Sequence, residues 1–152
     1  MAEERFTMEM AHQIENVPYI KVPNGMCSPG SVAIVLQNMG YEISPENIKD
    51  MGFEVLEEMD PLFKKYNGKY QRVEDPKVLL DKIANDTPIP VRIIPEGQTM
   101  RHSFVVIGYD MKKQAITIHD PVVGPNIEIP YYNFMKAWNR TGRGAIIYDK
   151  KV

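Results

Sequence analysis

Residues 23–40 read PNGMCSPGSVAIVLQNMG and contain the only cysteine of the chain, Cys27. The apolar run after the cysteine, closed by Gly40, predicts a buried helix from Cys27 to Met39. Pro29 fits the first turn of this helix, where a proline loses no hydrogen bond. Cys27 is therefore expected at, or just before, the helix N-terminus.

The residues around this helix predict a mostly helical first half. Before it, Val17 to Val22 is rich in apolar and β-branched residues and predicts an edge strand, which a Pro-Asn-Gly turn ends. Residues 1–16 are charged and form a separate N-terminal segment, with a short helix and a loose tail as the two alternatives. After it, capping residues and amphipathic patterns predict helices at residues 44–52, 55–66 and 76–84.

The second half of the chain changes to the period of β-strands. Strands are predicted at residues 89–94, 103–109, 115–119, 127–129 and 145–148, with a short helix at 131–138. Strands joined by short turns form an antiparallel sheet. The sequence thus predicts an α+β fold, in which residues 17–152 form one domain and the helical half packs on the sheet.

Composition limits the partners of the chain. Its 152 residues carry 18 basic and 20 acidic side chains, a formal net charge of −2, so we expect no nucleic acid and no membrane as partners. No apolar run reaches the roughly 20 residues of a membrane-spanning helix, and the charged N-terminus does not resemble a signal peptide. A single cysteine cannot form an internal disulfide, which fits a cytoplasmic setting.

Cys27 is the candidate nucleophile. A lone cysteine is most often a small buried hydrophobe. At a helix N-terminus, however, the partial positive charge lowers a thiol pKa, and the free N–H groups can hold an oxyanion. The predicted position of Cys27 therefore favours a reactive thiolate.

His102 and Asp120 are the candidate base and its orienting carboxylate. His102 stands at the start of the apolar strand SFVVIGY, where a sheet can aim it. His12 is most simply a surface residue, and for His119, at the end of the next strand, an exposed position is an equal alternative. Asp120 ends the next predicted strand, so in a hairpin it becomes a neighbour of His102. The alternative for Asp120 is a turn opener before Pro121.

Three segments resemble the stand-alone relatives of the bacteriocin-processing, double-glycine-leader cysteine peptidases of the papain-like clan. The resemblance covers most of residues 17–138. The segments are VPYIKVPNGMCSPGSVAIVLQNMGYEIS (17–44), TPIPVRII (87–94) with RHSFVVIGYD (101–110), and AITIHDPVVGPNIEIPYYNFMKAW (115–138). The resemblance implies a papain-like fold with Cys27 as nucleophile, His102 as general base and Asp120 as the residue that orients it.

Two positions depart from the pattern of these peptidases. They usually carry a Gln five or six residues before the cysteine, and its amide completes the oxyanion hole; this chain has Val22 and Lys21 there. Lys21 and Asn24 are the candidate replacement donors. Ser28 stands where a Gly usually follows the cysteine, which affects backbone packing more than chemistry.

The sequence therefore predicts a cysteine peptidase that hydrolyses peptide or isopeptide bonds in a peptide or protein substrate. Two alternatives remain open: an acyl or peptidyl transferase that uses the same triad, and a catalytically inactive papain-like domain that binds a peptide. Neither a phosphate-binding Gly loop nor paired Cys/His spacings are present, so we expect no cofactor and no metal.

Overall fold

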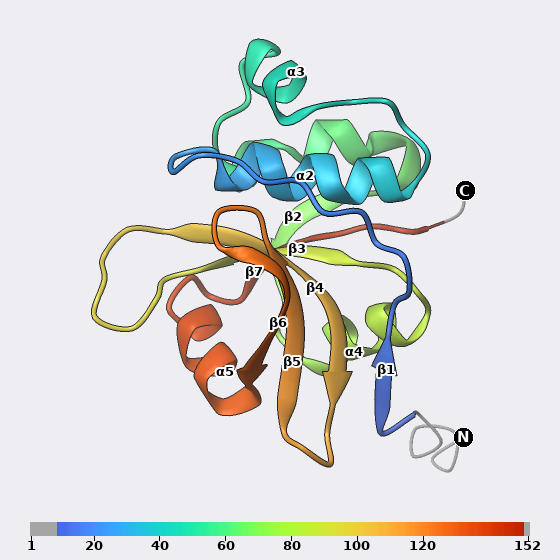
Figure 1. Cartoon of the computed structure of the whole chain (residues 1–152), viewed down its shortest axis with the longest axis vertical. Coiled ribbons are helices and arrows are strands. Elements are labelled where there is room, and N and C mark those ends of the chain that lie inside the picture. The colour runs from blue at the N-terminus through green and yellow to red at the C-terminus, as the bar shows by residue number, and fades with distance from the viewer. Residues whose placement is uncertain (1–8, 151–152) are drawn as a thin grey trace.

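A seven-stranded sheet forms the centre of the protein in this computed structural model, which describes residues 9–150 (Figure 1). The strands are β1 (Ala11–Gln13), β2 (Lys69–Arg72), β3 (Ile89–Ile93), β4 (His102–Asp110), β5 (Ala115–Asp120), β6 (Gly124–Pro130) and β7 (Gly144–Ile147). Their order is β2-β7-β3-β4-β5-β6, with β1 paired to β4, and each pair is antiparallel. The predicted antiparallel sheet is confirmed.

The helices pack around this sheet. They are α2 (Cys27–Asn38), α3 (Pro45–Asp50), α4 (Lys77–Ala84) and α5 (Tyr131–Asn139), with the 3-10 segments η1 (Leu56–Glu58) and η2 (Asp60–Tyr66). In Figure 1, α2 lies across the upper end of the sheet below α3, and α5 lies lower, beside β5 and β6. The predicted α+β arrangement, with a helical half against the sheet, is confirmed.

The helix α2 is the central helix of the core. Every residue from Ser28 to Leu36 is buried, which explains why this stretch is apolar on all sides apart from Ser28 and Ser31. The helix contacts β3, β4 and β5. Gly40 follows the C-cap with φ +96, a left-handed conformation that glycine adopts at little cost. The helix begins at Cys27, as predicted, and ends at Asn38, one residue before the predicted end, with Met39 as its C-cap.

Two predictions in the N-terminal part are wrong. Val17 to Val22 is not a strand; it crosses from the sheet to α2 with one backbone bond, from the Val22 N–H to the Pro121 carbonyl at 2.8 Å. Pro18 cannot donate to a ladder, which disfavours pairing there. The strand is instead β1, within a segment for which the sequence left only helix and tail as alternatives; residues 1–8 lie outside the described part of the chain.

The middle of the chain also differs from the prediction. The single helix expected at residues 55–66 is divided into η1 and η2 at Met59. Pro61 lacks the N–H that a continuous α-helix would use there, which favours the break. The strand β2 was not predicted, because its sequence KYQR is polar, as an exposed edge strand can be.

The remaining predicted elements agree with the structure to within a few residues. Among the described residues, no helix has the length and apolar character needed to span a membrane. In the same part of the chain, no group of three or more His, Cys, Asp or Glu side chains could bind a metal ion.

Candidate active site

Cys27 is the first residue of α2 and is half-buried. The helix has no side-chain cap at its N-terminus. Within residues 9–150, the backbone N–H groups of Cys27 and Ser28 have no hydrogen-bond acceptor. Free N–H groups and the partial positive charge of a helix N-terminus stabilise a thiolate and can hold an oxyanion. The local structure thus favours negative charge on the sulfur.

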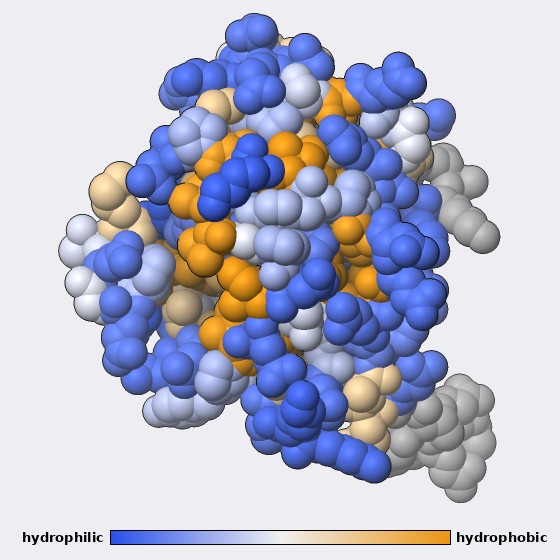
Figure 2. Space-filling model, in the orientation of Figure 1, coloured by the Kyte–Doolittle hydropathy of each residue, from blue (hydrophilic) through white to orange (hydrophobic). Residues whose placement is uncertain are grey.

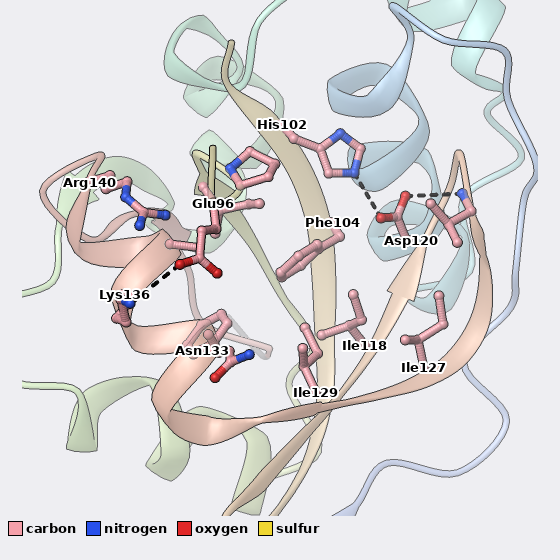
Figure 3. A pocket seen from close by; sticks show the side chains of 15 residues that line it. Glu96, His102, Phe104, Ile118, Asp120, Ile127, Ile129, Asn133, Lys136 and Arg140 are labelled. Atoms are coloured by element: carbon pink, nitrogen blue, oxygen red, sulfur yellow. Dashed lines mark hydrogen bonds and ion pairs between the residues drawn. The ribbon is translucent and has the colours of Figure 1, made fainter. Parts of the chain in front are cut away.

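His102 and Asp120 meet through their side chains just beyond the end of the β4–β5 ladder (Figure 3). The last pair of that ladder is Val105 with His119, so the two residues are not paired through their backbones. Nε2 of His102 lies 2.8 Å from Oδ2 of Asp120. Oδ1 accepts hydrogen bonds from the N–H groups of residues 122–123, at 3.0 and 3.2 Å. The following turn therefore fixes the carboxylate.

The pKa values of Cys27 and His102 move in opposite directions. Burial alone would raise the pKa of the Cys27 thiol, but the His102 imidazole, the Ser103 N–H and the charge of Arg92 outweigh burial and lower it. Burial would lower the pKa of His102. The carboxylate of Asp120, and to a smaller extent Cys27, outweigh burial and raise this pKa from 6.5 to about 9. Shifts in these directions favour a proton on the His102 nitrogen and a negative charge on the Cys27 sulfur.

Asp120 is ionised in this arrangement. Burial would raise the pKa of its carboxyl group, but the hydrogen bond and the charge of His102 outweigh burial, so the pKa lies below its ordinary value of 3.8. The backbone of Asp120 is also held, because the hydroxyl group of Tyr19 donates to its carbonyl oxygen at 2.7 Å. The carboxylate can therefore keep the imidazole in one orientation.

The two candidate oxyanion donors lie before α2. Nζ of Lys21 donates to the carbonyl oxygen of Val122 at 2.6 Å and lies 3.4 Å from that of Val123. These carbonyl groups lie two and three residues after Asp120, so the ammonium group binds the loop beside the site. Asn24 is exposed in the turn that precedes the helix. A role for Lys21 or Asn24 in holding an oxyanion stays a prediction.

The other two histidines are occupied elsewhere. The ring nitrogens of His12 lie 3.0 and 2.7 Å from two exposed carboxylates. His119, for which the sequence left an exposed position as an equal alternative, is buried, with 3% exposure. Its Nε2 lies 3.0 Å from the carbonyl oxygen of Val17, and the Asn126 N–H donates to its Nδ1 at 3.1 Å. His119 therefore links three segments of backbone.

Sequence reasoning missed a polar cluster behind Cys27. It consists of Arg92, Glu57 and the two serines that follow Cys27 and His102 in the chain. One signal in the sequence could have found it: Arg92 interrupts the otherwise apolar strand IPVRI. A charged residue in a strand of this kind is seldom buried unless it is paired.

An apolar pocket opens beside His102 and Asp120, with a cavity volume of about 350 Å³ (Figure 3). Its walls are apolar and come from the sheet and α5: Ile93, Phe104, Ile118, Ile127, Ile129 and Phe134. Polar side chains lie at its rim, where Nζ of Lys136 is 3.6 Å from Oε1 of Glu96. Figure 2 shows apolar surface over the start of α2 and from there toward α5.

Comparison with known proteins identifies the family. The model of the Peptidase_C39 like family matches residues 13–146. A crystal structure described as a C39-like peptidase from Bacillus anthracis is similar in fold, with a TM-score of 0.75, 17% identity, and coverage of 91% of this chain and 96% of that chain. None of the curated proteins matches. The predicted papain-like fold is confirmed, and the chain belongs to the Peptidase_C39-like family.

Proposed function

We propose that this chain is a cysteine peptidase that hydrolyses peptide or isopeptide bonds through Cys27. One observation carries the proposal: Nε2 of His102 lies 2.8 Å from Oδ2 of Asp120, and the Cys27 thiol and the His102 imidazole shift each other's pKa values in opposite directions. Since Nε2 of His102 faces Asp120, Nδ1 is the nitrogen left for the thiol. Membership of a peptidase-like family supports the same function.

The proposed reaction has two stages. The Cys27 thiolate attacks the carbonyl carbon of the scissile bond, and the Cys27 and Ser28 N–H groups hold the resulting oxyanion. The carbon–nitrogen bond breaks as His102 gives its Nδ1 proton to the leaving amine, which leaves a thioester on Cys27. Water then loses a proton to His102 and attacks the thioester. The acid product leaves, and the thiolate and imidazolium form again.

The pocket beside His102 supports a preference for an apolar substrate side chain near the scissile bond. Its walls are isoleucine and phenylalanine side chains, which favour burial of an apolar group. The cavity volume of about 350 Å³ is ample for one large side chain. Lys136 and Glu96 at the rim remain available for the polar atoms of an extended peptide.

A second candidate is a domain that binds a peptide without cleaving it. The observation that favours this function is the position of Lys21, the residue six places before Cys27. Its ammonium group is held by the carbonyl groups of Val122 and Val123, so it is a poor substitute for an amide donor in the oxyanion hole. Loss of one such donor typically costs about 10²–10³-fold in rate.

The first test is the rate of Cys27 alkylation by iodoacetamide against pH. We expect a thiolate that persists well below the ordinary thiol pKa of about 8.5, and we expect His102→Ala to abolish this behaviour. His12→Ala is the matched control, because it removes a surface imidazole. An ordinary pH profile in the parent, unchanged by His102→Ala, would exclude the thiolate–imidazolium pair and with it the peptidase.

The second test separates the functions that share a reactive cysteine. A mixed peptide library is incubated with the parent and with Cys27→Ala, and the products are identified by mass spectrometry. Cleavage by the parent alone supports the peptidase, and an adduct formed with added glycinamide would indicate acyl transfer. A reactive Cys27 with library peptides bound but neither cleaved nor transferred would indicate the binding domain.

A further inference from the structure

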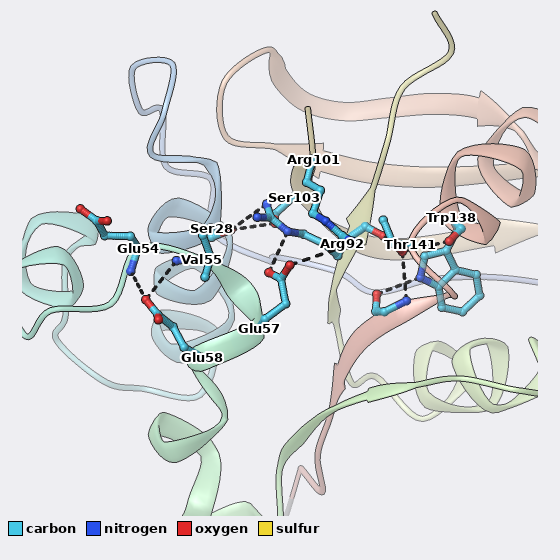
Figure 4. Close-up of polar contacts among 11 residues, drawn as sticks. Ser28, Glu54, Val55, Glu57, Glu58, Arg92, Arg101, Ser103, Trp138 and Thr141 are labelled. Carbon is cyan, nitrogen blue, oxygen red and sulfur yellow. Dashed lines mark hydrogen bonds and ion pairs between the residues drawn. The ribbon is translucent and has the colours of Figure 1, made fainter. Parts of the chain in front are cut away.

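Arg92 is a buried arginine behind the candidate active site. It is 5% exposed, although arginine is rarely buried unless it is paired. Its Nη1 donates to Ser28 Oγ at 3.3 Å and to Ser103 Oγ at 3.1 Å. The two serine hydroxyl groups are hydrogen-bonded to each other at 2.8 Å (Figure 4). The guanidinium group thus binds both serines at once.

These serines are the chain neighbours of the candidate catalytic pair. Ser28 follows Cys27 in the first turn of α2, and Ser103 follows His102 on β4. Both serines are almost completely buried, at 1% and 0% exposure. Because Arg92 on β3 pairs with Ser103 in the sheet, its side chain bridges from β3 and β4 to the start of α2. It therefore fixes the two segments that carry Cys27 and His102.

Arg92 is itself held at both ends. Its Nε lies 2.9 Å from Oε1 of Glu57, an ion pair that is not aligned for a hydrogen bond. The other oxygen of Glu57 lies 3.8 Å from Nη1 of the more exposed Arg101. At the backbone, Thr141 Oγ1 donates to the Arg92 carbonyl at 2.6 Å. The guanidinium group therefore has a defined position close to the site.

We propose that Arg92 is a positioning residue, which holds Cys27 against His102 through Ser28 and Ser103 and favours the thiolate by its buried positive charge. The inference rests on the proposed function, because it takes Cys27 and His102 as the reacting pair. In support, the charge of Arg92 is among the causes that lower the pKa of the Cys27 thiol. A charge in a buried setting acts more strongly than one in water.

The experiment measures the pH midpoint of Cys27 alkylation by iodoacetamide in folded variants. Arg92→Met removes the charge at similar volume, and we expect the midpoint to rise by about one pH unit, with about tenfold slower alkylation well below it. Arg92→Lys keeps the charge and is expected to restore part of the shift. Lys82→Met is the matched control, since it removes a cation that is paired with Asp149, and should leave the midpoint unchanged.

A folded Arg92→Met protein with the parent's midpoint would overturn the inference, because a purely structural role predicts that result. Should Arg92→Met not fold, the Ser28→Ala/Ser103→Ala double variant tests the inference. It removes the hydroxyl groups that Arg92 binds and keeps the Arg92–Glu57 ion pair. A raised midpoint in this variant supports the inference, and an unchanged one overturns it.

The outcomes also distinguish this inference from the proposed function, because alkylation needs no peptide substrate. A low parent midpoint that rises in Arg92→Met, without any peptide cleavage, upholds the role of Arg92 and refutes the peptidase. If instead the parent has a low midpoint and cleaves peptides, and Arg92→Met leaves the midpoint unchanged, the peptidase is upheld and the role of Arg92 is refuted. A parent midpoint at the ordinary value of about 8.5 refutes both.

Discussion

Replacement of Asp120 by Asn tests how the carboxylate controls His102. The variant keeps an oxygen that can accept from the N–H groups of residues 122–123, and it removes the negative charge that faces Nε2 of His102 at 2.8 Å. The change should therefore leave the turn intact and alter mainly the electrostatics of the imidazole.

The size of the effect follows from the pKa of His102. It rises from 6.5 to about 9 against the opposing effect of burial, and Asp120 is the largest cause of the rise. The rise corresponds to roughly 3 kcal/mol at 1.36 kcal/mol per pH unit. Because Cys27 contributes as well, we expect Asp120→Asn to lower the pKa of His102 by about one to two pH units. Peptide hydrolysis near neutral pH should fall by about 10–100-fold.

The assay is an NMR titration of the histidine ring protons, with the His102 signal assigned by its loss in His102→Ala. Asp149→Asn is the matched control, because its carboxylate interacts with Lys82 and Asn67. Should His102 still titrate near pH 9 in a folded Asp120→Asn protein, the carboxylate would not be the cause of the raised pKa. The assignment of Asp120 as the orienting residue would then be wrong.

Four further outcomes are expected. The pKa of Asp120 is lower in the folded than in the unfolded chain. Its stabilising contribution is therefore complete above pH 3.8 and is lost as the pH falls through the pKa of the folded state. In urea titrations, the difference in unfolding free energy between the parent and Asp120→Asn should shrink as the pH falls from 3.8 through that pKa. Ile127→Lys places a charge in the apolar pocket and should raise KM for apolar peptides at least about tenfold, whereas Glu128→Lys, on the exposed side of β6, should leave KM unchanged. Gly30→Ala would bring its Cβ to 2.9 Å from that of Pro121, and denaturant unfolding should show a loss of about 1–3 kcal/mol. Ile34→Ala in the fully buried part of α2 should cost about 2–5 kcal/mol by the same measurement, and a loss under 1 kcal/mol would contradict the packing described for this helix.

Local sequence patterns were sufficient for most of the fold. A continuous apolar run with Pro29 near its start and Gly40 at its end defines α2, because proline and glycine act on the backbone of their own segment. Alternating and β-branched residues likewise defined β3 to β7. Segments whose structure depends on distant partners were not predicted: β1 is a strand because it pairs with β4, and β2 because it pairs with β7.

By itself, the sequence determined the family, the helix that begins at Cys27, and the order of Cys27, His102 and Asp120 along the chain. Only the tertiary structure decided that the side chains of His102 and Asp120 meet beyond the end of their ladder, and that His119 is buried away from solvent. It alone also brought Arg92 to Ser28 and Ser103, 64 and 11 residues away along the chain. The physical reason is that hydrogen bonds and ion pairs depend on separations of a few ångströms in space, which spacing along the chain does not specify.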